Sequence, residues 1–148
     1  DASCQGKGIF LTRSLRGIVP TEPQVAQQYV SRPLLIDGFK FDLRIYVLVT
    51  CCAPLRMFMY SDGLTRMATV PYQMPTRRNM RQTCMHLTNY AINKDASGFV
   101  ANADAAEDGV GSKRSLRWFL SWLAEQGHDP DAVWWDIADV AIKTLMSA

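Results

Sequence analysis

The stretch LLIDGFKFDLRIYVLV occupies residues 34–49, and its alternation predicts a β-strand. Apolar side chains fall on one face of that strand: Phe41, Leu43, Ile45, Val47 and Val49. Charged and polar side chains fall on the other: Lys40, Asp42, Arg44 and Tyr46. This second face has two interpretations. It is a surface whose charges pair with neighbouring strands, at about 1 kcal/mol or less per pair. Alternatively it meets an anion and its metal, with Lys and Arg donating to phosphate oxygens while Asp42 holds the basic groups in place or helps to order the metal.

Length and composition limit the classes of function. With 148 residues, 48% of them apolar, the chain is expected to form one domain or a piece of one. It contains no apolar run long enough to span a bilayer, and DASCQGKG lacks the layout of a signal peptide, so we expect a cytosolic protein without membrane contact. The four cysteines have no metal-ligand spacing and are expected to be free thiols. The net charge of +2 argues against a nucleic-acid partner and leaves an acidic protein partner open.

The chain changes character near Gly109. Before it, strands are expected at 9–12, 25–30, 34–49, 55–60 and 65–70, with turns at Ala53-Pro54 and Asp62-Gly63, which together form an antiparallel meander. Residues 71–109 read as a long irregular connection. Two helices follow, the first ending at Gly127 and the second beginning at Asp129-Pro130. The pattern predicts an α+β fold, and its abrupt ends predict an incomplete fragment.

Three further segments carry groups that suit a ligand. Gly6 and Gly8 flank Lys7 and allow close approach of the backbone to a ligand, although a lone G-x-G is a weak signal and is more often an ordinary turn. An extended VAQQYV segment offers backbone groups to a flat base, and a plain half-buried strand is the alternative. HLTNYAINK (residues 86–94) is dense in small polar side chains, which suits either a ligand-binding loop or a self-satisfied turn. The basic run at Arg77, Arg78 and Arg81 suits solvation or an acidic peptide.

Taken together, these segments resemble the tubulin-tyrosine-ligase-like family, and the polyglutamylase branch in particular. The stretches that carry the resemblance run nearly end to end: QGKGI, QQYVSRPLLIDGFKFDLRIYVLVT, PLRMFMYSDGLTRMAT, HLTNYAINK, KRSLRWFL and DIADVAIKTLMSA. The resemblance implies that residues 1–148 form part of an ATP-grasp domain, an α+β fold that binds nucleotide between sheets. It also implies an ATP-dependent ligase that adds free glutamate to tubulin, especially its acidic C-terminal tails.

The resemblance also implies roles for individual residues. Arg44, Arg66 and His86 would be catalytic, with the two arginines meeting the γ-phosphate and the incoming amino acid. The nucleotide would contact the remaining site residues: Gln5, Gly6, Lys7, Gly8, Gln27, Gln28, Tyr29, Val30, Lys40, Asp42, Thr88 and Asn89. In this interpretation the charged face of residues 40–44 meets ATP.

The chain departs from the family pattern in two ways. The Lys-Pro before the glycine loop and the Asp and Glu-x-Asn that bind Mg²⁺ are missing, so no metal ligand is expected here and the carboxylates are expected beyond the C-terminal end. Ala91 and Arg114 replace the usual Ser and Trp. A non-catalytic tubulin- or microtubule-binding module and a glycine ligase are the alternatives. A cytoplasmic location on microtubules, in a cilium or at a basal body, is the expectation.

Overall fold

The computed structural model describes residues 8–16, 18–19, 23–102 and 108–147. The chain divides into two compact units. Unit 1 comprises residues 1–41 and 67–99, and unit 2 comprises residues 42–66 and 100–148. Within the described ranges, no helix has the length and apolar character needed to cross a bilayer. Strands and helices both occur, so the fold class is α+β as predicted.

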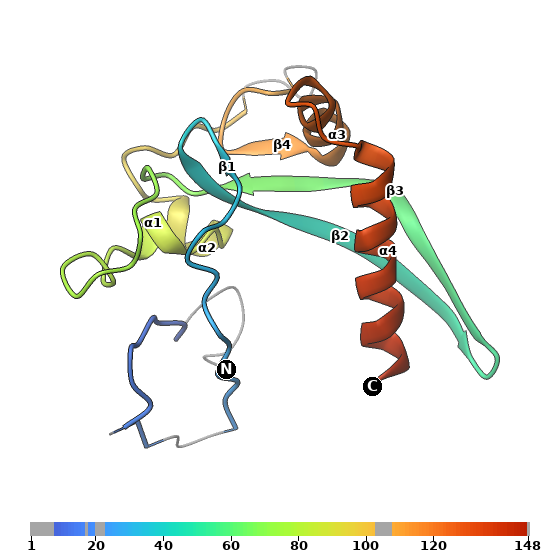
Figure 1. Cartoon of the computed structure of the whole chain (residues 1–148), viewed down its shortest axis with the longest axis horizontal. Coiled ribbons are helices and arrows are strands. Elements are labelled where there is room, and N and C mark those ends of the chain that lie inside the picture. Colours follow the sequence, from blue (N-terminus) through green and yellow to red (C-terminus); the bar gives the residue numbers. More distant parts are fainter. Residues whose placement is uncertain (1–7, 17, 20–22, 103–107, 148) are drawn as a thin grey trace. The chain divides into compact units, whose positions relative to one another are not determined.

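Two long strands dominate the sheet. They are β2 (Phe39–Cys52) and β3 (Leu55–Met67), and they join at the Ala53–Pro54 turn that the sequence predicted. Two short strands flank them, β1 (Leu35–Ile36) and β4 (Lys113–Ser115), in the order β1-β2-β3-β4 (Figure 1). β1 pairs antiparallel with β2, and β4 pairs antiparallel with β3. A meander is therefore present, but it is formed by β1, β2 and β3 and not by the predicted set of strands, and β4 adds an edge strand from the second half of the chain.

The prediction of a hairpin turn at Asp62-Gly63 was wrong, because these residues lie inside β3. The chain instead turns at an earlier Asp-Gly pair, Asp37-Gly38, which divides the expected strand 34–49 into β1 and β2. Asp37 and Gly38 have φ of 53° and 81°, the left-handed values that a tight hairpin requires. A Cβ on Gly63 would lie 2.4 Å from the carbonyl oxygen of Arg44. Gly63 is thus needed for close approach of the neighbouring backbone, not for a turn.

The first third of the chain contains less regular structure than predicted. Neither residues 9–12 nor residues 25–30 form a strand. Val25 and Val30 are largely exposed, so their apolar side chains do not face a core. The connection at 71–109 is more ordered than predicted, because it contains two one-turn helices, α1 (Thr83–His86) and α2 (Tyr90–Asn93). HLTNYAINK is therefore partly helical.

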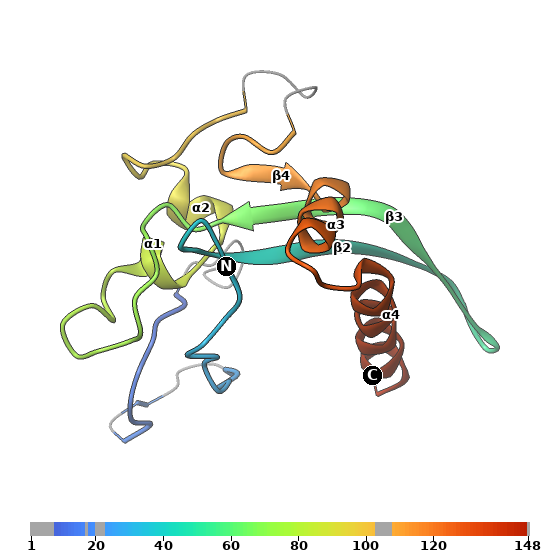
Figure 2. The same ribbon diagram turned by 45° about the horizontal axis from the view of Figure 1, so that its top comes forward.

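The two C-terminal helices were predicted correctly. They are α3 (Leu116–Glu125) and α4 (Pro130–Met146). The Asp129 side chain caps α4 by accepting hydrogen bonds from the backbone N–H groups of residues 131 and 132. Gly127, at φ 82°, ends the α3 turn. Within unit 2, α3 lies beside β4 and is followed by α4 (Figure 2).

Each unit has its own small core. Apolar residues buried in unit 1 are Ile36, Met67, Ala68 and Met85. Those buried in unit 2 are Leu116, Phe119, Leu123 and Ala138. Unit 1 also buries five polar residues among those described, namely Thr69, Asn79, His86, Thr88 and Asn93. Buried polar groups need hydrogen-bond partners, so the hydrogen bonds of these residues define how the interior of unit 1 packs.

Candidate functional site

The Lys40 ammonium in unit 1 sits among polar and aromatic groups that come from distant parts of the sequence. Its Nζ donates to the backbone carbonyl oxygen of His86 at 2.8 Å and to the Tyr29 hydroxyl at 3.3 Å. The same Nζ lies 4.3 Å from the centroid of the Tyr29 ring, a cation–π distance. Lys40 is half-buried on β2, so these contacts restrict a side chain that would otherwise be flexible.

The His86 imidazole is fully buried behind this lysine. Its Nε2 lies 3.2 Å from the carbonyl oxygen of Asn79, and its Nδ1 lies 3.2 Å from the Tyr29 hydroxyl. A carbonyl oxygen can only accept, so Nε2 carries the proton and donates it to Asn79. In the neutral ring Nδ1 is then an acceptor, and the Tyr29 O–H donates to it. Burial lowers the pKa of His86, and the Lys40 charge adds a smaller effect in the same direction, while the hydrogen bond to the Asn79 carbonyl partly opposes them; the net shift favours the neutral ring.

Two tyrosines pack edge-on against His86. The centroid distances are 5.9 Å to Tyr29 and 6.0 Å to Tyr72, with interplanar angles of 85° and 90°. The Tyr72 hydroxyl donates to the carbonyl oxygen of Ser31 at 2.7 Å and so ties down the chain after Tyr29. Burial and the neighbouring Tyr72 hydroxyl raise the pKa of Tyr29, so Tyr29 stays protonated and able to donate.

Unit 2 holds a second charged group, a guanidinium–carboxylate fork between β3 and β2. Arg66 Nε donates to Asp42 Oδ1 at 2.7 Å, and Arg66 Nη2 donates to Asp42 Oδ2 at 2.5 Å. The side chains are 22% and 36% exposed, so the pair is partly screened by solvent but accessible to a ligand. The hydrogen bond to Asp42 raises the pKa of Arg66 further. The fork fixes the plane of the guanidinium. It also agrees with the interpretation of this face as a surface whose charges pair across neighbouring strands.

Arg44 occupies the next position on the charged side of β2 and is exposed. Its guanidinium carbon lies 5.8 Å from the centroid of the Tyr46 ring. Within the described part of the chain Arg44 forms no ion pair. Its charge is therefore available to an anionic ligand, while the charge of Asp42 is matched by Arg66.

Besides His86, HLTNYAINK buries Asn93 almost completely. Asn93 accepts from the backbone N–H and hydroxyl of Thr69, and it donates to the carbonyl oxygens of Leu87 and Asn89. Asn93 is therefore structural. The side chain of Asn89 does not cap the helix that follows it, and Asn89 is only half-buried. Thr88 is buried.

The remaining predicted nucleotide contacts are only partly described. Gln5, Gly6 and Lys7 lie outside the described residues. Gly8 is exposed at φ 79°, a conformation that favours glycine. Gln27, Gln28 and Val30 are exposed in an irregular segment, whereas Tyr29 turns its ring under Lys40. Arg77, Arg78 and Arg81 are exposed.

The structure brings together Tyr29, Lys40 and His86 in one unit and Asp42 with Arg66 in the other. The sequence did not identify Tyr72 and Asn79 as partners of His86. They are separated from it by 14 and 7 residues within an irregular connection, where no periodicity indicates which side chains meet. Within the described ranges, no three His, Cys, Asp or Glu side chains lie close enough together to hold an ion.

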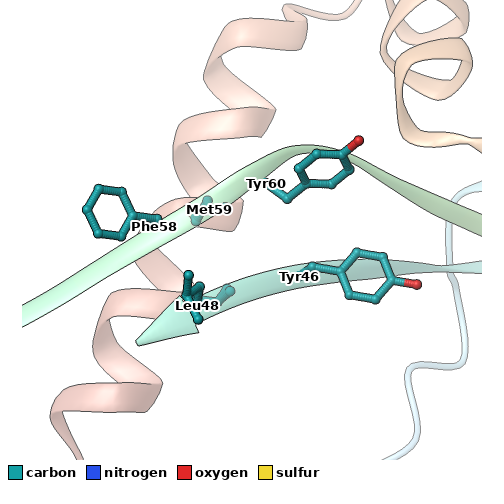
Figure 3. Close-up of a pocket in the computed structure, with 6 residues that line it drawn as sticks. Tyr46, Leu48, Phe58, Met59 and Tyr60 are labelled. Carbon is teal, nitrogen blue, oxygen red and sulfur yellow. The ribbon is translucent and has the colours of Figure 1, made fainter. Parts of the chain in front are cut away.

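A shallow hollow of about 340 Å³ lies over the distal part of the β2–β3 hairpin. Figure 3 shows its lining side chains along the two strands. The lining residues are Tyr46, Val47, Leu48, Phe58, Met59 and Tyr60. None of the six is charged, so the hollow offers no ionic partner to a phosphate group.

Known proteins resemble the chain along its whole length. The mouse tubulin polyglutamylase TTLL13 is 55% identical over 148 residues, which is 100% of this chain and 18% of the mouse protein. Its human counterpart is 53% identical, with the same coverage of both proteins. A probable beta-tubulin polyglutamylase of Tetrahymena thermophila is 54% identical across 100% of this chain and 12% of its own length. The chain thus spans less than a fifth of the length of these relatives.

The sequence profile described as "Tubulin-tyrosine ligase family" matches residues 1–148. The match includes the strand that carries Lys40, Asp42 and Arg44 and the segment that carries His86. The resemblance seen in those motifs is confirmed, and the chain belongs to the tubulin-tyrosine ligase family.

Proposed function

We propose that the protein is an ATP-dependent carboxylate–amine ligase that adds glutamate to glutamate side chains of tubulin. The observation that carries this proposal is the identity of 51–55% with six proteins described as tubulin polyglutamylases, one of them as probable. Residues 1–148 would form part of one ligase domain of the ATP-grasp type. The α+β class and the charged side of β2 are compatible with that architecture.

The proposed reaction has two steps. A side-chain carboxylate oxygen of the acceptor attacks the γ-phosphorus of ATP, which forms an acyl phosphate and releases ADP. The amino nitrogen of free glutamate then attacks the acyl carbon, loses a proton, and expels inorganic phosphate to leave an isopeptide bond. The protein contributes mainly by positioning the reactants and by stabilising charge on the transferring phosphoryl group and on the tetrahedral oxyanion.

The cationic residues divide this work. Lys40, held at its Tyr29 and His86 contacts, would donate to phosphate oxygens of ATP. Arg44 would meet the γ-phosphate, and its exposed guanidinium is compatible with that role. Arg66 would bind the carboxylate of the incoming glutamate. Asp42 would orient Arg66 through the two hydrogen bonds of the fork.

The other proposed contacts to nucleotide surround these charges. Gln27, Gln28 and Val30 would line the adenine, and Thr88 and Asn89 would contribute from HLTNYAINK. The loop that contains Gln5, Gly6, Lys7 and Gly8 would cover the phosphates. We assign His86 a positioning role, because the ring has no exposed surface and both of its nitrogens are engaged within the protein.

Magnesium would accompany ATP, as the family resemblance implies. The described residues do not provide a set of ligands for it, so no step of this mechanism is assigned to the metal. A consequence can be tested directly. The 148-residue chain, purified alone, should not glutamylate tubulin, because Lys and Arg alone do not neutralise a transferring γ-phosphoryl group at a useful rate. Incorporation of glutamate by this chain alone would contradict the expectation.

Purified tubulin supplied with ATP, Mg²⁺ and radiolabelled glutamate tests the function of the whole protein that carries this chain. We expect ATP-dependent incorporation of label into the acidic C-terminal tails, and removal of the tails by protease should abolish it. Labelled glycine in place of glutamate distinguishes a glycine ligase. Binding to microtubules without incorporation of either amino acid would support the non-catalytic module and overturn the proposal. Activity on microtubules would also place the protein at the cytoskeleton.

A further inference from the structure

We infer that Tyr29, His86 and Asn79 form a hydrogen-bonded relay whose role is to position Lys40 for the phosphates of ATP. The inference rests on the proposed function for the identity of the ligand, and on the structure for the relay. It assigns Tyr29 a task different from lining the adenine. Tyr29 and His86 act through Lys40 and are therefore positioning residues.

The Asn79 carbonyl oxygen, which can only accept, determines which group donates in each hydrogen bond of the relay. The Asn79 carbonyl oxygen has no proton to give, so the bond at 3.2 Å must use the Nε2 proton of His86. Nδ1 of the neutral ring can then only accept, and the Tyr29 hydroxyl must donate its single proton to it. The lone pairs of that hydroxyl consequently face Lys40, whose Nζ donates to it at 3.3 Å.

A second contact defines the position of the ammonium. Lys40 Nζ donates at 2.8 Å to the backbone carbonyl oxygen of His86, the residue whose ring anchors Tyr29. His86 therefore supports Lys40 through its main chain and its side chain. The Tyr29 ring is a third neighbour of the ammonium, with its centroid 4.3 Å from Nζ. An ammonium with fixed neighbours loses less rotamer entropy when a phosphate binds than a free lysine side chain does.

The burial of His86 explains why a histidine suits this position. The ring is fully enclosed, and a charged imidazolium there would be repelled by the Lys40 ammonium, which contacts the same Tyr29 hydroxyl, and would turn Nδ1 into a second donor. Such a ring could no longer accept from Tyr29. The relay thus requires the neutral Nε2–H tautomer, and burial together with the Lys40 charge lowers the pKa of His86 and favours that form.

Nuclear magnetic resonance tests the relay without any ligand. Imidazole ¹⁵N chemical shifts of His86 should show a neutral ring protonated at Nε2 at pH 7. Tyr29→Phe should shift the Nδ1 resonance, because the ring stays and its hydroxyl donor is lost. Tyr60→Phe, which removes a hydroxyl from a 62% exposed tyrosine, is the matched control and should leave the resonance unchanged. A ring protonated at Nδ1, or unaffected by Tyr29→Phe, would overturn the relay.

A double-mutant cycle tests positioning in the whole protein that carries this chain. Tyr29→Phe should raise the Kd for MgATP about tenfold, the worth of one charge-assisted hydrogen bond. In a Lys40→Met background the same change should alter Kd less than about twofold, because its effect passes through the ammonium. A merely structural role for Tyr29 would weaken binding equally in both backgrounds and would refute the inference. Failure of the unsubstituted protein to bind MgATP would overturn the proposed ligase and the target of Lys40, whereas the spectra judge the relay independently.

Discussion

Replacing Arg66 by lysine tests the role of the guanidinium fork most directly. Arg66 uses Nε and Nη2 on the two oxygens of Asp42, at 2.7 and 2.5 Å, which leaves Nη1 for a substrate carboxylate. A lysine ammonium keeps the charge but cannot make two parallel hydrogen bonds in one plane. Because both side chains are partly exposed, at 22% and 36%, loss of one bond should reduce the free energy of unfolding by only about 1 kcal/mol.

The catalytic loss should be larger than the loss of stability. If the guanidinium binds the incoming glutamate and also touches the transferring phosphoryl group, Arg66→Lys should remove roughly 2–4 kcal/mol of transition-state stabilisation. That corresponds to a fall of about 30- to 1,000-fold in kcat/KM for glutamate. The KM for ATP should change by less than about threefold. Arg44→Lys, on the residue assigned to the γ-phosphate, should impair the use of both substrates.

Steady-state kinetics on the whole protein that carries this chain, with ATP and glutamate varied separately, provide the measurement. Arg56→Lys is the matched control, because Arg56 lies on the same strand β3, is exposed, and forms no ion pair within the described residues. It should keep both kinetic constants. Unchanged glutamate kinetics in Arg66→Lys would show that Arg66 is only a cross-strand partner of Asp42, and the assigned role would be refuted.

Three further predictions concern stability. Gly63→Ala should lower the free energy of unfolding by about 1–3 kcal/mol in urea denaturation, because the new Cβ would lie 2.4 Å from the Arg44 carbonyl oxygen. Ser61→Ala, at an exposed position, is the control, and equal stability of the two variants would contradict the prediction. Asp129→Ala should cost about 1 kcal/mol through loss of the α4 cap, and the same loss in mid-helix Asp136→Ala would argue against capping. The folded state lowers the pKa of His86 below the ordinary value of 6.5, so the unfolded chain binds the proton first as the pH falls. The melting temperature should therefore decline from pH 7 toward pH 5. His86→Asn, although less stable, should show a smaller decline over the same pH range.

The sequence by itself determined the features that depend on local periodicity and local chemistry. The apolar and polar alternation of β2 predicted a long strand, the Pro54 turn predicted the hairpin, and Asp129-Pro130 predicted the start of α4. Each of these signals acts within a few residues along the chain, so no distant contact is needed to interpret it. The family motifs are also local strings, which is why the family could be recognised before any geometry was known.

Tertiary structure decided the features in which distant groups compete for one position. The Asp37-Gly38 and Asp62-Gly63 pairs have the same local preference for a turn. Only the close approach of the Arg44 backbone to Gly63 shows that the second pair belongs inside a strand. VAQQYV has the composition of a strand, yet Tyr29 is placed by Lys40 and His86, which follow it by 11 and 57 residues. His86 itself was one polar residue among several in its motif. Its burial and its two ring contacts, which sequence spacing cannot reveal, made it the anchor of the relay.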